Sequence, residues 1–267
     1  MNDVLVVVGV GGMGRAIARR LGSGKTVLLA DYNDETLQAA ASSLSGDGYQ
    51  VTARSVDVSS AESVGALAKE AAALGSVSQV AHTAGLSPSQ APAAAILAVD
   101  LLGVALVLDE FAKVIAPGGA GVIVASMAGH MFPPLTPEQE RAVIEASAQE
   151  LLKVPFISEL TEPALAYGVA KRANQIQVQA ASKVWGERGA RINSISPGII
   201  STPMGQLELA SPVGEGMRAM TAVSAAGRVG TPDDIAAAAS FLLGPDASFI
   251  TGADLLVDGG VTAALRQ

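Results

Sequence analysis

Residues 4–18 read VLVVVGVGGMGRAIA, and this stretch decides the class of fold. Val4–Val8 is an unbroken aliphatic run, which is typical of a strand buried on both faces. Gly9, Gly11 and Gly14 follow it with the spacing G-x-G-x-x-G, and Arg15–Leu21 has helical character. Such a turn lets the backbone approach a pyrophosphate, whose charge the helix N-terminus stabilises. The stretch therefore predicts a dinucleotide-binding turn, although a plain tight turn could carry the same glycines.

Strand-like and helix-like segments alternate along the rest of the chain. Strands are expected at residues 26–30, 51–56, 77–82, 121–125, 191–195 and 253–257. Helices are expected at residues 34–44, 61–74, 94–114 and 232–243, and around Tyr167 as far as about residue 185. This alternation is typical of parallel strands with right-handed crossovers and helices on both faces. We therefore expect one α/β domain over residues 1–267, a Rossmann-type doubly wound parallel sheet.

Composition and charge exclude several classes of protein. Hydrophobic residues make up 49% of the chain and charged residues 16%, so a large core can form and disorder is not expected. The net charge of −8 comes without a basic cluster, which argues against a nucleic-acid partner. No cysteine and only two histidines argue against disulfides and a metal site. The apolar runs are too short for a signal sequence or a membrane span, so we expect a cytoplasmic protein.

Asp31 closes the second expected strand, 22 residues after Gly9. A carboxylate at this place can accept hydrogen bonds from the ribose hydroxyls of NAD, and it would repel the 2′-phosphate of NADP. The other interpretation is a loop residue that caps the next helix. Together with the glycine turn, the first interpretation favours NAD as the cofactor.

Tyr167 and Lys171 lie in the stretch AYGVAKR, residues 166–172. On a helix, positions i and i+4 share one face, so a phenol and an ammonium would lie side by side. This pair could be an accident of the surface or a device for moving a proton. A free phenol has a pKa of about 10, and a neighbouring ammonium lowers it toward the range useful in acid-base catalysis.

Five further motifs, in chain order, resemble those of the short-chain dehydrogenase/reductase family. They are SVDVSS from Ser55, TAG at Thr83–Gly85, VIVAS ending at Ser126, INSISPGIISTPM at Ile192–Met204 and LLVDGG at Leu255–Gly260. With the glycine turn and the Tyr167–Lys171 pair, the resemblance covers nearly the whole chain. It implies an NAD(H)-dependent oxidoreductase that interconverts a secondary alcohol and a ketone.

The resemblance also implies roles for individual residues. Tyr167 would be the general acid/base, Lys171 would lower its pKa and hold the nicotinamide ribose, and Ser126 would bind the substrate oxygen. The implied cofactor-binding residues, besides Tyr167 and Lys171, are Gly9, Gly11, Met13, Gly14, Asp31, Asp57, Val58, Ala84, Gly85, Pro197, Ile200 and Thr202. A small-molecule substrate and a homodimer or homotetramer are implied as well. The family's common dimer buries the long central helix and the tyrosine helix against their partner copies.

The sequence departs from the family's pattern at three places. The glycine turn is one residue shorter than the usual G-x-x-x-G-x-G form, although Gly12 and Gly14 match its later glycines. Asp100 stands where the family often has an asparagine that supports a water chain to the lysine. Asp100 could hold a water, raise the pKa of Lys171, or be only structural. The third departure is the separation of Ser126 and Tyr167, which is 41 residues and far longer than usual.

The extra length predicts an inserted segment at about residues 127–166, close to the active site. It contains an expected helix from Pro137 to Leu152, with Thr136 and Gln139 as a capping box, and the apolar residues Met131, Phe132 and Phe156. The segment could form a hydrophobic lid or reshape a subunit interface. The segment offers few polar side chains for a substrate, which favours a bulky apolar substrate that is steroid-, terpenoid- or acyl-like.

Two other functions use the same fold. The chain could be a non-catalytic NAD(H)-binding sensor or scaffold, for which Asp100 and the short turn argue. It could also catalyse a related reaction such as epimerisation or dehydration.

Overall fold

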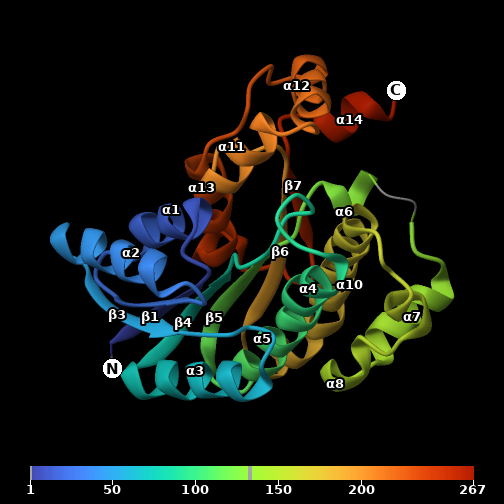
Figure 1. Cartoon of the computed structure of the whole chain (residues 1–267). Helices are drawn as coiled ribbons and strands as arrows, with labels where there is room; N and C mark the ends of the chain where they lie inside the picture. Colours follow the sequence, from blue (N-terminus) through green and yellow to red (C-terminus); the bar gives the residue numbers. More distant parts are fainter. Residues whose placement is uncertain (1, 132–133) are drawn as a thin grey trace.

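Seven parallel strands form one sheet in the computed structural model, which describes residues 2–131 and 134–267 (Figure 1). The strands are β1 (Asp3–Val8), β2 (Thr26–Asp31), β3 (Gln50–Ser55), β4 (Ser76–His82), β5 (Ile115–Val124), β6 (Arg191–Pro197) and β7 (Asp254–Val257). Their order across the sheet is β3-β2-β1-β4-β5-β6-β7. The chain therefore runs outward in one direction from β1 and then in the other from β4. This confirms the predicted doubly wound sheet.

Helices cover both faces of the sheet. One face carries α1 (Gly12–Leu21), α2 (Asp34–Gly46) and α13 (Pro232–Leu243), and the other carries α3 (Ala61–Leu74), α5 (Gly103–Ala112) and α10 (Pro163–Glu187). Two separate apolar clusters fill the two layers, because alternate residues of each strand point to opposite faces. In β1, Val4 and Val6 belong to one cluster, and Leu5 and Val7 to the other. The continuous aliphatic run of this strand thus has a partner layer on each side.

The strand order reverses between β1 and β4. The glycine turn follows the carboxyl end of β1, and the TAG segment follows the carboxyl end of β4. The amide of Gly9 donates to Ala30 O at 2.7 Å, and the amide of Ala84 donates to Val8 O at 3.0 Å. The glycine turn and the TAG segment therefore lie side by side at the edge where open α/β sheets bind ligands.

The expected helix at residues 94–114 has a π-helical centre. It consists of α4 (Ala93–Ile96), a π-helical stretch η1 (Leu97–Leu102) and α5, which ends at Ala112. Such bulges frequently occur at functional sites. Asp100 lies within η1 and is fully buried, so it does not have an ordinary surface position on a regular helix.

Residues 127–166 form four short helices and the start of α10. These are α6 (Ala128–Met131), α7 (Pro137–Glu145), α8 (Ala148–Leu151) and α9 (Pro155–Ser158). The capping box of Thr136 and Gln139 is confirmed, but the helix predicted from Pro137 to Leu152 is wrong in its length. Ala146 has an extended backbone (ψ 129°), which ends α7 and starts a new turn at α8. Phe132 and Pro133 lie outside the described residues.

The helices α7 to α9 pack against α10 and the α4–η1 helix. Val143, Leu151 and Ile157 join Leu97 and Ala170 in a third apolar cluster, against which Phe156 also packs. An ion pair between Arg172 Nη2 and Glu140 Oε1 at 2.7 Å ties α7 to α10. Figure 1 shows α7 and α8 on the outer side of α10. These helices cover the outer side of α10 and contribute nothing to the cavities at the strand ends.

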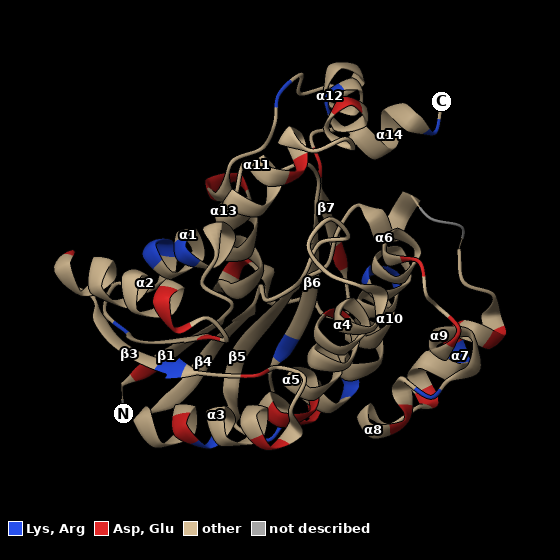
Figure 2. Ribbon diagram, in the orientation of Figure 1, with Lys and Arg blue, Asp and Glu red and all other residues tan. Residues whose placement is uncertain are grey.

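Three helices without a sequence prediction lie beyond the ends of β6 and β7. They are α11 (Pro203–Ala210), α12 (Gly214–Val223) and α14 (Val261–Leu265), and they group together in Figure 1. A 3-10 turn, η2 (Pro245–Ala247), follows α13. Basic and acidic side chains are interspersed over the surface helices in Figure 2, as a net charge of −8 without a basic cluster leads one to expect.

Candidate active site

A cavity of about 500 Å³ opens at the carboxyl ends of β1, β2, β3 and β4. Seven residues predicted from the sequence to bind a cofactor line it: Gly9, Gly11, Asp31, Asp57, Val58, Ala84 and Gly85. Small-molecule sites commonly have volumes of about 300–1,000 Å³. We call this space the dinucleotide cavity.

The glycine turn leaves no room for side chains on its inner side. Gly9 has φ +89°, which favours glycine, and a Cβ there would overlap the backbone of Thr83 and Ala84. A Cβ on Gly14 would overlap Gly9 O. By contrast, Gly11 is exposed and has nothing within 4 Å of its Cβ position. The turn is thus closed toward the protein and open toward the cavity at the N-terminus of α1, as the pyrophosphate of a dinucleotide requires.

Asp31 lies at the end of β2 with its carboxylate in the dinucleotide cavity. Its Oδ2 accepts from Val10 N at 2.7 Å, and its Oδ1 accepts from Asn33 N at 2.9 Å. Each oxygen keeps a free lone pair for a ribose hydroxyl, since a carboxylate offers about four acceptor positions. The cap of α2 is Asn33, which accepts from Thr36 N at 2.8 Å, so Asp31 is not the capping residue. Among the described residues that line this cavity, none is Lys or Arg.

A second cavity of about 280 Å³ continues from the first toward β6. Ser126, Tyr167, Met13, Pro197, Ile200 and Thr202 line it, and Met204 lines both cavities. We call it the substrate cavity. Thr202 is also the cap of α11, where its hydroxyl accepts from Gly205 N at 3.0 Å.

Ser126 and Tyr167 reach the substrate cavity from opposite elements. Hydrogen bonds from Ala125 N to Ile195 O and from Met127 N to Pro197 O, both 2.8 Å, continue the β5–β6 ladder around Ser126. Tyr167 is on the first turns of α10, whose N-terminus is capped by the Glu162 side chain accepting from Leu165 N at 2.6 Å. The serine is therefore held by the sheet and the tyrosine by a capped helix.

Lys171 and Gly14 line neither cavity. Lys171 is only 4% exposed, lies under the site, and has its Nζ 5.4 Å from the centroid of the Tyr167 ring. Its ammonium pairs with Asp100 Oδ2 at 3.0 Å and donates to Val124 O at 3.4 Å. Asp100 Oδ1 accepts from Leu86 N at 2.8 Å, so the carboxylate is fixed from two sides. A Cβ on Gly85 would approach both members of this ion pair.

The buried ion pair sets the charge beneath Tyr167. Burial lowers the pKa of Lys171, but attraction to Asp100 and Tyr167 outweighs it and the pKa is raised. Burial raises the pKa of Asp100, and Lys171 and the Leu86 amide oppose that rise. Of the three roles considered for Asp100, the structure supports the one in which it raises the pKa of Lys171.

The net effect on Tyr167 differs from the expectation of a lowered pKa. Burial raises the pKa of the Tyr167 phenol, and Asp100 and Glu208 raise it further. Lys171 and the Ser126 hydroxyl lower it, as predicted for the lysine, but they do not compensate. The sequence places Lys171 beside Tyr167, whereas burial depends on the whole tertiary structure. Tyr167 therefore holds its proton at neutral pH in the described structure.

The two histidines of the chain lie outside both cavities and bond or pack within the protein. His82 ends β4, is fully buried, and has its pKa lowered to about 3 by burial and by the charge of Lys171. His130, in the segment between Ser126 and Tyr167, is partly exposed and lines neither cavity. Its Nε2 bonds to Asp254 Oδ2 at 2.7 Å, and Asp254 also accepts from Ser194 and Ser196.

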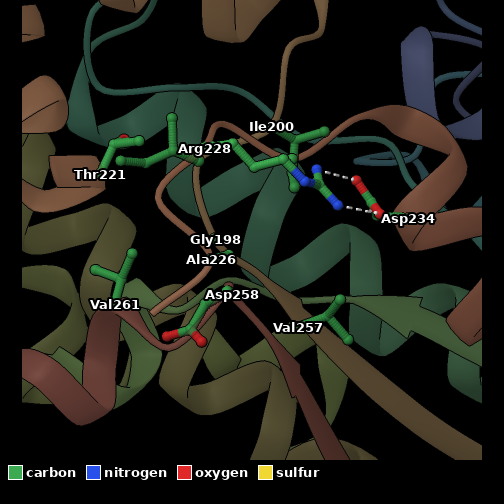
Figure 3. A pocket seen from close by; sticks show the side chains of 12 residues that line it. Gly198, Ile200, Thr221, Ala226, Arg228, Asp234, Val257, Asp258 and Val261 are labelled. Atoms are coloured by element: carbon green, nitrogen blue, oxygen red, sulfur yellow. Dashed lines mark hydrogen bonds and ion pairs between the residues drawn. The ribbon is translucent and has the colours of Figure 1, made fainter. Parts of the chain in front are cut away.

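A smaller cavity of about 180 Å³ lies along the Gly198–Ile200 loop (Figure 3). Its charged groups are paired with each other or with the backbone. Arg228 makes two bonds to Asp234, at 2.8 and 2.9 Å, and Asp258 accepts from Gly260 N and Thr262 N. Backbone bonds from Gly230 N to Ile199 O and from Ser201 N to Gly230 O brace the loop. This cavity therefore supports the loop between β6 and α11 and offers little free capacity for a ligand.

Sequence reasoning missed the residues that α11 and α12 bring to the substrate cavity. Glu208, Met217 and Met220 line it, yet they are 41 to 53 residues from Tyr167 in the chain. No motif marks them. In the part of the chain that the structure describes, no helix is both long and apolar enough to cross a membrane.

The strand-order reversal, the two adjoining cavities and the Tyr167–Lys171 pair define a dinucleotide-binding protein of the Rossmann class. A family model described as short chain dehydrogenase matches residues 2–137, and one described as enoyl-(acyl carrier protein) reductase matches residues 156–262. A short-chain dehydrogenase/reductase of Alternaria brassicicola is 43% identical over 100% of this chain and 98% of its own length. D-threitol dehydrogenase of Mycolicibacterium smegmatis is 32% identical over 97% of this chain and 92% of its own length.

Solved structures share the fold of this chain. A short-chain dehydrogenase/reductase from Serratia marcescens has a TM-score of 0.77 and 24% identity, and 98% of each chain is covered. The chain belongs to the short-chain dehydrogenase/reductase family. Its named relatives include dehydrogenases that act on alcohols, and the family binds a nicotinamide cofactor, NAD or NADP.

Proposed function

We propose that the protein is an NAD(H)-dependent oxidoreductase that interconverts a secondary alcohol and a ketone. The observation that carries this proposal is one continuous site. Ser126 and Tyr167 share a cavity above Lys171, and this cavity adjoins a second one of dinucleotide size that holds the Asp31 carboxylate. The relative named D-threitol dehydrogenase supports an alcohol as the substrate.

The chain's own residues would divide the work as follows. The dinucleotide cavity would bind the cofactor, which supplies or accepts the hydride when bound. The Ser126 hydroxyl would donate a hydrogen bond to the substrate carbonyl oxygen and stabilise the charge that develops there. Tyr167 would donate its proton to that oxygen during reduction and accept it back during oxidation. Lys171, held by Asp100, would keep a positive charge under the phenol. This charge lowers the pKa of Tyr167 and so opposes the effect of burial on that pKa.

The raised pKa of Tyr167 favours one direction at neutral pH. A protonated phenol is the form needed to reduce a ketone, whereas alcohol oxidation needs the phenolate. We expect ketone reduction to be constant at neutral pH and to fall as the pH rises through the Tyr167 pKa. Alcohol oxidation is expected to increase over the same range.

NAD rather than NADP is proposed as the cofactor because of Asp31. The carboxylate faces the dinucleotide cavity, and none of the described lining residues supplies a cation for a 2′-phosphate. A mainly apolar substrate is proposed because methionines dominate the substrate cavity. The 280 Å³ volume suits a compact body, so a steroid-sized substrate would require α11 and α12 to move outward.

We also propose that residues 127–166 contain a segment inserted into the family's fold. Residues 138–155 fall between the two ranges matched by the family models, which supports this proposal. Among the described residues, only the start of the segment lines the substrate cavity, so α7 to α9 favour the interface role over the lid. A homodimer or homotetramer and a cytoplasmic location stay predictions. Because α7 to α9 cover α10, such an oligomer would not use the family's common helix pairing unchanged.

Consumption of NADH and of NADPH over a panel of compact apolar ketones and diketones tests the proposal. We expect turnover with NADH and far less with NADPH. Firm NADH binding without turnover of any ketone, or of the matching alcohols with NAD, would contradict the enzyme and favour the sensor. Turnover that leaves NADH unconsumed would instead favour an epimerase or dehydratase.

A further inference from the structure

The substrate cavity holds nearly all the methionine of the chain. Of seven methionines in the sequence, six line it: Met13, Met127, Met131, Met204, Met217 and Met220. They come from four different helices and from the segments that flank them. Methionine is unbranched and polarisable, so a wall of methionines adapts to apolar ligands of varied shape. The cavity wall as a whole therefore selects for an apolar body and does little to orient it.

One carboxylate interrupts this wall. Glu208 projects from α11, lines the substrate cavity together with Tyr167, and is half-buried. Glu208 makes no ion pair among the described residues. Burial raises the pKa of Glu208, and only the Ser87 hydroxyl opposes that rise. A half-buried carboxylate that lacks strong donors is stabilised by any ligand that provides one.

Ser87 gives a second and independent observation at the same place. It follows the TAG segment, is 2% exposed, and its Oγ has no well-aligned hydrogen-bond partner among the described residues. Buried hydroxyls are nearly always hydrogen-bonded. The Ser87 hydroxyl lies within reach of the Glu208 carboxylate, and the next residue, Pro88, lines the substrate cavity. A buried hydroxyl and a half-buried carboxylate therefore meet at the edge of this mainly apolar cavity.

We propose that Glu208 and Ser87 form a polar subsite for a second hydrogen-bond donor on the substrate. The substrate would be a compact, mainly apolar ketone or secondary alcohol that carries a further hydroxyl or amine away from the reacting carbon. Glu208 would accept from this group and so fix which carbon faces Tyr167 and Ser126. Specificity of this kind is strong because a substrate without the donor leaves the buried polar groups unpaired.

This inference rests on the proposed ketone reduction. A set of matched substrates distinguishes a failure of the polar subsite from a failure of the proposed function. The substrates are cyclohexanones with a hydroxyl, an amine or a methyl group at the 3- or 4-position, reduced with NADH. We expect the wild-type protein to prefer the hydroxyl or the amine over the methyl compound by about tenfold or more in kcat/KM, the size of a hydrogen bond to a charged group. Failure to reduce any of them would count against the proposed function, whereas reduction of all with equal efficiency would overturn only the polar subsite.

Variants of Glu208 identify the acceptor. Glu208→Leu should abolish the preference, so that the ratio of kcat/KM for the hydroxyl or amine compound to that for the methyl compound falls to about one. Glu208→Gln, which keeps an amide oxygen but no charge, should retain part of a hydroxyl preference and lose an amine preference. Glu215→Ala is the matched control, because Glu215 is an exposed acid on α12 that lines neither cavity. An unchanged preference in Glu208→Leu, or an equal loss for all substrates, would show that Glu208 has only a structural role in α11.

Discussion

The two adjoining cavities are built in different ways. The dinucleotide cavity is formed by strand ends, glycine turns and short loops that the sheet holds in place, and most of its predicted contacts come from backbone or from single carboxylates. The substrate cavity is roofed by α11 and α12, which lie beyond the sheet and present flexible methionine side chains. In the proposed function, the cofactor would meet a surface held by the sheet, and the substrate would meet an adaptable one. The predictions below test this contrast.

Ser126→Ala should cause the largest loss among the substitutions that keep the Tyr167 hydroxyl. Removing one hydrogen-bond donor to a developing oxyanion costs about a hundredfold or more in kcat. The dinucleotide cavity does not include Ser126, so the Kd for NADH should stay the same. Steady-state kinetics and NADH titration measure the two quantities. Equal loss of binding and turnover would show that the two cavities are not separable in this way.

Gly14→Ala should destabilise the glycine turn of the dinucleotide cavity. The new Cβ would overlap Gly9 O, and overpacking of this kind costs about 1–3 kcal/mol of the free energy of unfolding. Urea unfolding measures this cost, and NADH affinity should fall with it. Gly46→Ala in α2 is the control, because nothing lies within 4 Å of its Cβ position. Similar stability in both variants would contradict the close packing of the turn.

Asp31→Ala should change cofactor preference by about tenfold or more. It removes the acceptor for ribose hydroxyls and the charge that repels a 2′-phosphate, and hydrogen bonds to charged groups are worth about 1.5–3 kcal/mol. The ratio of kcat/KM for NADH to that for NADPH gives the result. Because Asp31 also holds Val10 N, some loss with both cofactors is expected. An unchanged ratio would mean that another residue sets the preference.

Asp100→Asn should shift the pH profile by the smallest amount. Asp100 raises the pKa of Tyr167, so removing its charge should lower that pKa. Reduction needs the protonated phenol, and its loss at high pH should therefore begin at a lower pH than in the wild type. The pH dependence of kcat/KM for ketone reduction measures the shift. Asp109→Asn, an exposed aspartate on α5, should leave the profile unchanged.

The contrast between the cavities also explains what the sequence could predict. Spacing alone predicted that Gly9, Gly11 and Asp31 would lie together, because each of them follows a strand end by a few residues at most, and the structure places all three around one cavity. The proximity of Tyr167 and Lys171 was predictable because one helical turn separates them. Glu208 and the methionines have no such local signal, since they reach the cavity only through the placement of α11 and α12. The pKa of Tyr167 also lacks a local signal. The neighbouring lysine predicted a lowered pKa, whereas burial by the whole fold raises it.

Tyr167→Phe most directly tests the role given to the tyrosine. The substitution removes only the hydroxyl, and Tyr49→Phe, whose hydroxyl donates to Arg19 O away from both cavities, is the matched control. We expect the Kd for NADH to stay within about threefold while kcat for ketone reduction falls by about a hundredfold to ten-thousandfold, the range of a lost acid/base. Ketone reduction at the wild-type rate in Tyr167→Phe would contradict the assignment of Tyr167 as the proton donor.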